Sequence, residues 1–448
     1  MQMPLKSRPS GGILTVRTVN PPQPPQAING IGGDFMYENN TRKERAVLAC
    51  VNTGEFDAEA SLAELAELAD TAGAEVLGEF LQNRKTPDTA AYLGEGKLRE
   101  IREFCRQQEA DLLILDDELS GTQIRNIEEI TGVHAIDRTT LILDIFARRA
   151  RSREGRIQVE LAQQKYRLPR LTGLGKQLSR LGGGIGTRGP GESKLESDRR
   201  HIRRRIDALE AELAALGSSR ARVRKRRAKN GAITAAIVGY TNVGKSTILN
   251  LLTSAEVYVQ DQLFATLDPT ARELTLPNGQ RIILVDTVGL IQRLPHQLVE
   301  AFHSTLEEAA DADLILNVCD CSNPAVDRQL EVTRQLLDEL GCGGIPTITV
   351  YNKVDLCPDA ERLIGNDRTV FISAKERKNL DGLLRAMETA LSEKMRRVTL
   401  EIPYSDGAVR NLLRERGHVF REEFLEDRVR IEANVDEKIL KFLLPYRV

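Results

Sequence analysis

The chain has 448 residues, of which 41% are hydrophobic and 29% are charged, and this length leaves room for about two to four domains with cores of their own. No apolar run is long enough to cross a bilayer, and no signal-peptide pattern opens the chain. We therefore exclude a membrane-spanning protein and expect a cytoplasmic one. Peripheral association with a membrane is left open. The net charge of −2 gives no overall sign of nucleic-acid binding, and the six cysteines form no ligand cluster, which predicts a reduced protein without a structural metal.

Residues 1–42 are rich in Pro, Gly, Gln and Asn and show no hydrophobic period, so we expect them to be disordered. The letters GGDFM, which end at Met36, can be encoded by a purine-rich run just ahead of a start codon. Met36 is therefore a candidate translation start, with residues 1–35 untranslated, and the intact mass of the native protein tests this hypothesis.

Strand-like and helix-like segments alternate between residues 43 and 140. RAVLACV, AEVLGEFL and DLLILD are typical of strands, whereas GKLREIREFCRQQ and GTQIRNIEEI are typical of helices. Another helix is predicted to begin after Asp57 as its cap, to carry leucines at 62, 65 and 68, and to stop at Gly73. This alternation predicts a small parallel α/β domain.

The next segment, residues 141–230, is predicted to be helical and basic. Between Arg199 and Asn230 there are twelve Lys or Arg residues against three acidic residues. A coiled-coil-like seam is indicated by apolar residues with spacings of 7, 4, 3, 4 and 3, namely Leu195, Ile202, Ile206, Leu209, Leu213 and Leu216. We expect a helical hairpin interrupted by the glycine-rich stretch GLGKQLSRLGGGIGTRGPGES.

That glycine-rich stretch lacks a preceding strand and a following Lys-Ser or Lys-Thr, so it fails the test for a phosphate loop. The matching motif lies in AAIVGYTNVGKSTILNLL, where an apolar strand leads into the pattern and a helix follows it. Gly239 and Gly244 let backbone N–H groups approach phosphates, Lys245 reaches the β and γ oxygens, and the Ser246 hydroxyl is a candidate Mg²⁺ ligand.

Three later segments, each at a strand end, favour GTP as the nucleotide. In LVDTVG, Asp286 fits the carboxylate behind Mg²⁺ and Gly289 offers an N–H to the γ-phosphate. In TVYNKVDL, Asp355 can accept from N1–H and the 2-amino group of guanine, whereas adenine would leave the carboxylate unpaired. In FISAKE, backbone N–H groups can close the base pocket.

Hydrolysis is predicted to be slow in the isolated protein, because Leu290 occupies the position at which Ras-type GTPases carry a water-orienting glutamine. Asn242 could hold a potassium ion against the phosphates, although bracing of the first switch segment explains this residue equally simply. In QLFATLDPT, Thr266 is the candidate for the second Mg²⁺ hydroxyl, with Thr270 as the alternative. His296 and His303 are expected to be loop and helix-surface residues.

The candidate GTP-binding residues thus follow the order of these motifs: Gly239, Tyr240, Thr241, Asn242, Val243, Gly244, Lys245, Ser246, Phe264, Ala265, Thr266, Leu267, Asp268, Asp286, Thr287, Val288, Gly289, Asn352, Lys353, Val354, Asp355, Ser373, Ala374 and Lys375. The expected fold class is α/β, with a GTPase domain at residues 231–394 and a small C-terminal β/α domain at residues 395–448. We expect a monomer that binds GTP and GDP with Mg²⁺, and with K⁺ if Asn242 holds it.

GGGIGTRGPGESKLESDRR, followed by GYTNVGKST, FATLDPT, DTVGLI, NKVD and SAK, closely resembles the HflX family of translational GTPases. AAYLGEGKLREI resembles the N-terminal signature of that family, so that the likeness covers residues 43–448. The resemblance implies the Obg–HflX branch, which lacks the usual glutamine, and a factor that binds mainly the large ribosomal subunit and splits stalled ribosomes. It also implies that the N-terminal domain faces ribosomal RNA and that the glycine-rich loop reaches towards the peptidyl-transferase centre.

In this picture a thin loop enters RNA and basic residues beside it contact phosphates, with the candidates Arg188, Lys194, Arg199, Arg200, Arg203, Arg204 and Arg205. On composition alone, a flexible hinge followed by a solvated helix explains the same letters. Two other functions remain open, namely a ribosome-assembly GTPase and an RNA-remodelling NTPase with a second nucleotide site in the N-terminal domain. For the latter, YLGEGK is the candidate contact, although it is also typical of a turn that starts a helix.

Overall fold

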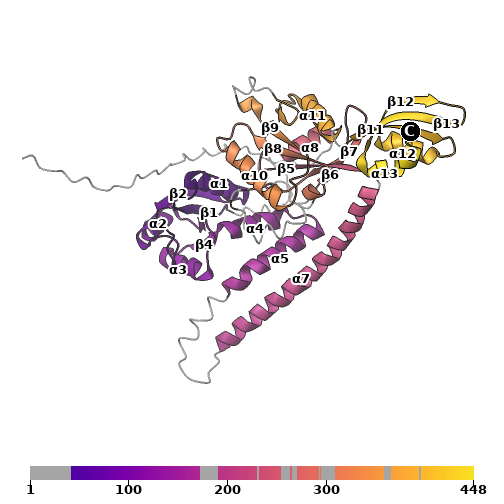
Figure 1. Cartoon of the computed structure of the whole chain (residues 1–448). Coiled ribbons are helices and arrows are strands. Elements are labelled where there is room, and N and C mark those ends of the chain that lie inside the picture. Colours follow the sequence, from indigo (N-terminus) through magenta and orange to yellow (C-terminus); the bar gives the residue numbers. More distant parts are fainter. Residues whose placement is uncertain are drawn as a thin grey trace, which may run out of the picture. The chain divides into compact units, whose positions relative to one another are not determined.

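The structure is a computed structural model of the whole chain (Figure 1). It describes residues 42–171, 190–229, 232–253, 263–264, 270–291, 293, 308–357, 365–392 and 395–448. The expected disordered segment, the candidate start Met36, most of the glycine-rich stretch and the two histidines at 296 and 303 lie outside the described residues. The chain divides into two compact units, Met1–Leu141 and Ile142–Val448, which are described separately.

The first unit contains a four-stranded parallel sheet in the order β2-β1-β3-β4. Its strands are β1 (Arg45–Asn52), β2 (Glu75–Asn83), β3 (Leu112–Leu115) and β4 (His134–Asp137), and its helices are α1 (Ala58–Thr71), α2 (Glu95–Gln108) and α3 (Gly121–Thr131). Val47, Ala49 and Val51 alternate along β1 and pack in one core with residues of α2 and α3. The parallel α/β domain predicted from the sequence is therefore confirmed.

Local signals in the sequence place the helix ends of this unit. The side chain of Asp57 accepts a hydrogen bond from the backbone N–H of Ala60 at 3.0 Å, as expected of the cap that starts α1. Ser120 and Gln123 form a reciprocal capping box at the start of α3. Strand β4 was not predicted, because its four residues HAID show no apolar run.

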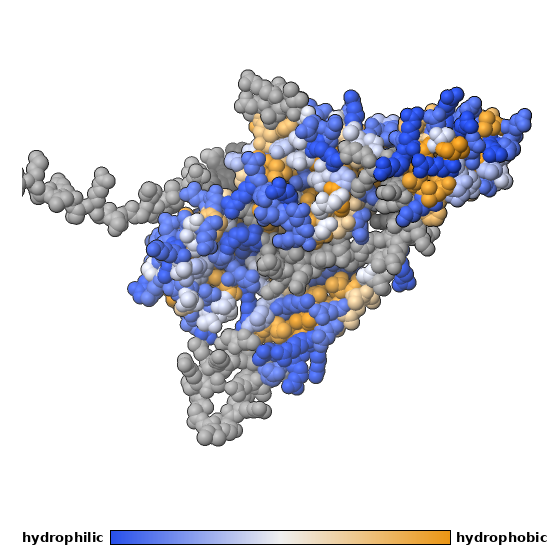
Figure 2. Space-filling model, in the orientation of Figure 1, coloured by the Kyte–Doolittle hydropathy of each residue, from blue (hydrophilic) through white to orange (hydrophobic). Residues whose placement is uncertain are grey.

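Two helices of the second unit form the predicted hairpin, α5 (Arg153–Arg170) and α7 (Pro190–Lys229), and they follow α4 (Arg138–Arg149), which begins in the first unit. Ile157 and Leu161 of α5 pack against Ile206 and Leu209 of α7, and the seam residues 202, 213 and 216 lie beside them. Figure 2 shows apolar side chains of this hairpin as a stripe bordered by hydrophilic residues. The predicted seam is confirmed for these positions, and the side chain of Leu195 lies outside the described residues.

The nucleotide-binding motifs fall on a six-stranded sheet in the order β10-β9-β8-β5-β7-β6, in which only β6 is antiparallel to its neighbour. The strands are β5 (Ile233–Gly239), β6 (Thr270–Thr275), β7 (Arg281–Asp286), β8 (Leu314–Asp320), β9 (Thr347–Asn352) and β10 (Thr369–Phe371). The helices are α8 (Lys245–Thr253), α10 (Val326–Glu339) and α11 (Leu380–Ser392). Because the parallel strands share one direction, their carboxyl ends bring the separate motifs to one edge.

The last segment forms a three-stranded antiparallel sheet in the order β11-β13-β12 with two helices. Its elements are β11 (Met395–Pro403), α12 (Gly407–Arg416), β12 (His418–Phe424), β13 (Arg428–Asp436) and α13 (Glu437–Leu443). Leu400, Ile431 and Leu413 belong to its buried core, whereas Arg397, Glu401 and Arg430 are charged residues of the same strands. None of the helices in the part of the chain that the structure describes is long and apolar enough to span a membrane.

Candidate functional site

The turn between β5 and α8 depends on two glycines in conformations that other residues rarely adopt. Gly239 has a φ of +144°, and a Cβ there would lie 2.1 Å from the carbonyl oxygen of Val318. Gly244 has a φ of +94°, and a Cβ there would lie 2.4 Å from Nδ2 of Asn352. Because neither position has room for a side chain, the backbone of the turn can approach phosphate oxygens closely at the N-terminus of α8.

Lys245 begins α8 and folds its side chain back over this turn. Its Nζ donates to the carbonyl oxygen of Tyr240 at 2.6 Å and to that of Gly239 at 3.1 Å, and the residue is 6% exposed. Burial lowers the pKa of Lys245 to about 8, against the opposing effect of the nearby Asp286 carboxylate. A phosphate anion beside Nζ would favour the charged ammonium and raise the pKa of Lys245 again.

Ser246 and Asp286 meet from two different elements to form an oxygen-rich corner. Ser246 Oγ donates to Asp286 Oδ2 at 2.7 Å, and Asp286, the last residue of β7, is fully buried. A hydroxyl and a carboxylate are the hard oxygen donors that Mg²⁺ prefers, so these residues fit that ion, with Ser246 as ligand and Asp286 behind it. Bound Mg²⁺ would neutralise charge on the β and γ phosphates.

The segment that follows β7 is tied to the phosphate turn by backbone hydrogen bonds. Thr241 N donates to Leu290 O at 2.8 Å, and Leu290 N donates to Gly239 O at 3.1 Å. A Cβ on Gly289 would lie 2.6 Å from Cγ2 of Thr241 and 3.2 Å from Nζ of Lys245, so only glycine fits here. Gly289 therefore lies beside the lysine that is expected to contact the γ-phosphate.

The two residues between Asp286 and Gly289 anchor this segment in the sheet. Thr287 donates from both its N and its Oγ1 to the carbonyl oxygen of Ile237, at 3.2 and 2.7 Å. Thr287 and Val288 are 1% and 4% exposed. Leu290 is also buried, at 4% exposed, and its apolar side chain cannot orient a water molecule by hydrogen bonding.

Asn352 connects three loops at the other end of the site. Its Nδ2 donates to the carbonyl oxygen of Val243 at 2.8 Å, and its Oδ1 accepts from the backbone N–H of Ala374 at 2.9 Å. Because Asn352 ends β9 and is 2% exposed, it fixes the phosphate turn and the SAK segment relative to the NKVD segment. Sequence analysis assigned this residue to the nucleotide site, and the structure adds its bracing contacts.

The side chains that would face guanine are themselves held in place. Lys353 has a φ of +63°, and its Nζ lies 2.8 Å from Oδ2 of Asp320. Asp355 Oδ1 accepts from Ser373 Oγ at 2.6 Å, and Val354 N donates to Ile372 O at 3.3 Å. A carboxylate in this position can pair with the two adjacent N–H donors of guanine, while Lys375 is exposed beside the pocket.

The first switch segment lies mostly outside the described residues. Residues 265–268, including the candidate Mg²⁺ ligand Thr266, belong to this part, and Thr270, the alternative, begins β6. Phe264 is buried with a φ of +53°, and its ring centroid lies 4.6 Å from that of Phe146 at an interplanar angle of 73°. Asn242 is exposed with a φ of +59°, and its role as a potassium ligand stays a prediction.

Sequence reasoning missed two groups that shape the site. Asp320, which positions Lys353, ends β8, and its place opposite Asn352 follows from the register of β8 with β9. The carbonyl oxygen of Val318 closes the space next to Gly239. The first could have been found from a charged residue at the end of the apolar run LILNVC, whereas the second is a backbone contact without a sequence signal.

The arginines predicted to bind RNA fall into two groups on α7. Arg205 forms two hydrogen bonds with Glu160 of α5, at 2.6 and 2.7 Å, and this pairing competes with a contact to RNA. Arg200, Arg203 and Arg204 are exposed, and Arg199 is half-buried with a nitrogen 3.8 Å from Glu196. Arg188 and the side chain of Lys194 lie outside the described residues.

The YLGEGK turn in the first unit starts α2, because Gly94 is the residue before its first turn. Gly94 N donates to Gln82 Oε1 at 2.9 Å. Lys97 Nζ lies 2.7 Å from Glu100 Oε2 and 5.8 Å from the ring centroid of Phe80. The lysine is therefore engaged within its own domain, as expected of a turn that starts a helix.

The second unit thus combines a phosphate cradle with one buried cation, two oxygen donors for a divalent metal and an oriented carboxylate for a purine base. This set can hold a guanine nucleoside triphosphate with its γ-phosphate beside Gly289.

Comparison with known proteins finds relatives over most of the chain. Three family models match consecutive parts of the chain: "GTP-binding GTPase N-terminal" at residues 59–147, "GTP-binding GTPase Middle Region" at residues 149–227 and "50S ribosome-binding GTPase" at residues 234–353. The GTPase HflX of Caldanaerobacter subterraneus subsp. tengcongensis is 53% identical, and the match covers 92% of this chain and 96% of that protein. The GTPase HflX of Escherichia coli is 40% identical, and the match covers 88% of this chain and 93% of that protein. A GTP-binding protein from Sulfolobus solfataricus in complex with GDP is 25% identical, with a TM-score of 0.42 over 78% of this chain and 99% of that chain.

Proposed function

The chain belongs to the HflX family of GTPases, and on that premise we propose that it binds the large ribosomal subunit in its GTP form and splits stalled ribosomes in the cytoplasm. The match of residues 234–353 to a 50S ribosome-binding GTPase supports the choice of partner. GTP binding would order the switch segments around Gly289, and hydrolysis would release them and reset the factor.

The observation that carries this proposal is that the described part of the nucleotide pocket holds groups suited to phosphates and Mg²⁺, whereas Leu290 stands where Ras-type GTPases carry a glutamine that orients water. Lys245, Ser246 and Asp286 are arranged to bind phosphates and Mg²⁺, yet Leu290 is buried and apolar. A site with this combination binds GTP well and hydrolyses it slowly by itself. We therefore propose that the ribosome supplies the stimulation, and that GTP binding drives splitting while hydrolysis drives recycling.

The hairpin of α5 and α7 is the proposed RNA-binding element. Arg200, Arg203 and Arg204 are exposed on one stretch of α7, and each contact with a phosphate would release counterions from the RNA. The glycine-rich loop, with Arg188 and Lys194 beside it, is proposed to enter a narrow RNA crevice, since glycine has no side chain to obstruct entry. Affinity for the subunit should fall steeply as salt is raised.

The decisive experiment mixes the purified chain, loaded with a non-hydrolysable GTP analogue, with intact ribosomes and separates the products on a sucrose gradient. We expect ribosomes to shift to free subunits, with the protein migrating in the large-subunit fraction. Lys245→Ala is the matched control, because it removes the phosphate contact and should leave the ribosomes intact. If only precursor subunits bind and mature ribosomes stay whole, the protein is an assembly factor instead.

Potassium dependence tests the proposed second role of Asn242. If this residue holds K⁺ against the phosphates, GTP turnover should be faster in potassium than in sodium buffer, and Asn242→Ala should remove the difference. Equal rates of the unchanged protein in the two buffers would exclude the metal and leave Asn242 as a brace for the first switch segment.

A further inference from the structure

Two of the six cysteines lie in contact beside the segment that is predicted to bind the guanine base. Cys321 directly follows the last residue of β8, and Cys357 directly follows the short 3₁₀ helix η2 (Val354–Leu356). A side-chain hydrogen bond joins their thiols. The pair therefore connects two segments that are distant in the sequence and adjacent at the edge of the sheet.

The backbone explains why these two thiols meet. Cys321 N donates to the carbonyl oxygen of Asn352, the last residue of β9, at 2.9 Å. Lys353 then has a φ of +63°, which turns the chain out of the strand, and Cys357 N donates to Val354 O at 3.1 Å. Because one short turn separates Asn352 from Cys357, the second cysteine stays close to the strand end that holds the first.

Both of these cysteines are partly exposed, whereas the other four are buried. Leu356, which precedes Cys357, is 58% exposed, so the turn faces solvent. Cys319, two residues before Cys321, is buried, and its Sγ donates to Val350 O at 3.6 Å. A small molecule in solution can therefore reach the pair of thiols but not the neighbouring cysteine of β8.

The equilibrium between two thiols and a disulfide depends on how strongly ionisation stabilises the reduced form. A pair with a stabilised thiolate gives a disulfide that is easily reduced. Burial, together with the hydrogen-bonded thiol of Cys357, raises the pKa of Cys321 to about 12, so Cys321 stays protonated at neutral pH. The reduced form of Cys321 gains no stabilisation from ionisation, and this favours the disulfide at equilibrium.

A bond between these sulfurs would act on the base-binding segment from two sides. Lys353 pairs at 2.8 Å with Asp320, which precedes Cys321, and Asp355 lies two residues before Cys357. The bonded sulfurs of a disulfide are about 2.05 Å apart, closer than the sulfurs of two hydrogen-bonded thiols, so the bond would draw the turn towards β8. This displacement would move the Asp355 carboxylate relative to the guanine that it is predicted to bind.

We propose that Cys321 and Cys357 form a reversible disulfide that weakens the binding of guanine nucleotides. The oxidant is a small-molecule disulfide such as oxidised glutathione. The Cys357 sulfur attacks one sulfur of this oxidant, which breaks its S–S bond and releases one glutathione thiol. The Cys321 sulfur then attacks the Cys357 sulfur of the mixed disulfide and releases the second glutathione thiol, so the two electrons and two protons that the protein loses pass to glutathione. This inference depends on the guanine site but not on the proposed action on ribosomes.

The first test equilibrates the full-length protein, freed of nucleotide, with mixtures of oxidised and reduced glutathione, and then measures its mass after acid quenching. We expect the loss of two hydrogens and, after digestion, a peptide with Cys321 joined to one with Cys357. Cys319→Ala is the matched control, because it removes the neighbouring thiol on β8 and should leave this bond unaffected. Cys321→Ser should stop the reaction at a glutathione adduct on Cys357.

The second test measures GDP affinity by titration calorimetry with Mg²⁺ before and after oxidation. Affinity should be about threefold to tenfold lower for the oxidised protein, because hydrogen bonds from guanine to Asp355 are weakened, and dithiothreitol should restore it. Cys321→Ser combined with Cys357→Ser should bind GDP equally well under both conditions. Binding of GDP by the reduced protein tests the guanine site separately.

Thermodynamic linkage gives a reciprocal check on the same bond. If the disulfide weakens GDP binding, saturating GDP must oppose the disulfide by the same factor. The squared concentration of reduced glutathione divided by that of oxidised glutathione, taken at half-oxidation, should therefore fall about threefold to tenfold when GDP is added. The proposal would be overturned if Cys321 and Cys357 formed no bond at any glutathione ratio, or if the bond left GDP affinity unchanged. An equal loss of affinity on oxidation of the double serine variant would also overturn it.

Discussion

The nucleotide pocket and the α5–α7 hairpin are both charged, yet they hold their charges in opposite ways. In the pocket, Lys245, Asp286 and Asn352 are buried, and each has partners at fixed distances on another loop or strand. On the hairpin, Arg200 and Arg204 are exposed on a helix surface. No neighbouring side chain can replace a buried group that is bonded to fixed partners, whereas several exposed charges on one surface make similar contributions to binding. A single substitution should therefore lower ligand affinity strongly in the pocket and only weakly on the hairpin.

The largest expected effect is that of Lys245→Ala. The lysine is the buried cation of the phosphate turn, and its removal would take away the hydrogen bonds that this charged donor is expected to make with two phosphates. GTP and GDP affinity, measured by titration calorimetry, should fall by about 100-fold or more. Lys375→Ala, which removes an exposed lysine from the base side, should change affinity far less. Similar losses of nucleotide affinity in both variants would show that the buried lysine contributes no more to binding than the exposed one.

The next effect separates nucleotide binding from hydrolysis. In Gly289→Ala the added methyl group would meet Thr241 and Lys245, so the segment after β7 must move away from the γ-phosphate. Hydrolysis on the ribosome should fall by about tenfold to 100-fold, while GDP affinity is retained because GDP lacks that phosphate. Gly344→Ala is the control, since a Cβ there meets nothing within 4 Å. Loss of GDP binding would show that the segment supports the whole pocket.

Local signals explain how much of this site could be predicted from sequence. The phosphate turn, Asp286 at a strand end and the cap at Asp57 depend on residues close in the chain, and each has a spacing that follows from helix or strand geometry. The hairpin seam was predictable for the same reason, because a repeat of three and four residues marks one helix face.

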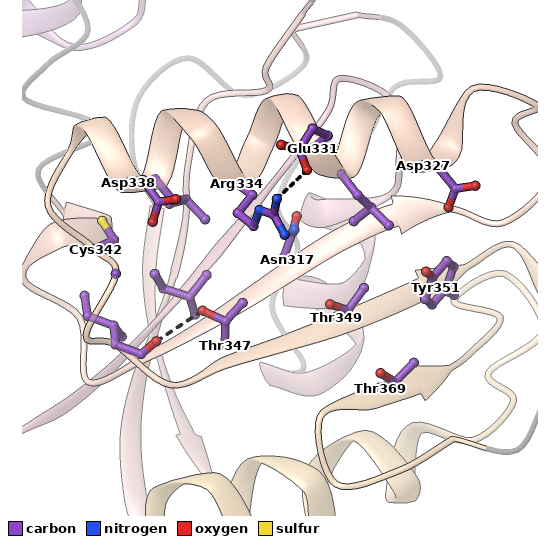
Figure 3. A pocket seen from close by; sticks show the side chains of 15 residues that line it. Asn317, Asp327, Glu331, Arg334, Asp338, Cys342, Thr347, Thr349, Tyr351 and Thr369 are labelled. Carbon is purple, nitrogen blue, oxygen red and sulfur yellow. Dashed lines mark hydrogen bonds and ion pairs between the residues drawn. The ribbon is translucent and has the colours of Figure 1, made fainter.

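Contacts that depend on strand register could not be predicted. Asp320 reaches Lys353 because β8 and β9 pair with Asp320 opposite Asn352, and nothing near either residue encodes that register. The cavity between α10 and the sheet (Figure 3) has the same origin, since Asn317, Thr349 and Thr369 in its lining come from three different strands. Arg205 was expected to contact RNA, and its pairing with Glu160 emerges only when α5 and α7 lie side by side.

A smaller effect is the pH dependence of GTP affinity, which follows from the burial of the Lys245 charge. Burial lowers the pKa of Lys245 to about 8 in the free protein, and bound phosphate should raise it. Below pH 8 the lysine is charged in both states, so affinity for GTP should be constant. Above pH 8 binding requires proton uptake, and affinity should fall by up to about tenfold per pH unit until the pKa of the complex is reached.

Two measurements check this pH dependence. Calorimetric titrations in buffers of different ionisation enthalpy should show proton uptake on GTP binding near pH 9 but not near pH 7, in accordance with the direction of the shift. Lys245→Arg keeps its charge throughout this range, so the affinity that remains in this variant should not decline between the two pH values. A decline of equal steepness in the arginine variant would assign the titration to another group.

The smallest expected effect is on the hairpin. Replacing Arg200, Arg203 and Arg204 together by glutamine removes three exposed cations without reversing charge, and affinity for the large subunit should fall by about threefold to tenfold at moderate salt. If all three contact phosphates, the slope of log affinity against log salt should become less steep by about 2 to 3, because fewer counterions are released. GTP affinity should not change.

Arg205 offers the sharpest comparison within the same helix. Both guanidinium groups are exposed, but that of Arg205 is bonded twice to Glu160, whereas Arg204, one residue earlier, forms no ion pair with another described residue. Arg204→Gln should therefore flatten the salt dependence of subunit binding by about one unit, and Arg205→Gln should leave it unchanged, since its charge is already balanced by the glutamate. An equal change in salt dependence in both variants would mean that the pair between Arg205 and Glu160 opens on the ribosome. The hairpin would then resemble the nucleotide pocket, because a charge that is paired in the free protein would bind the ligand.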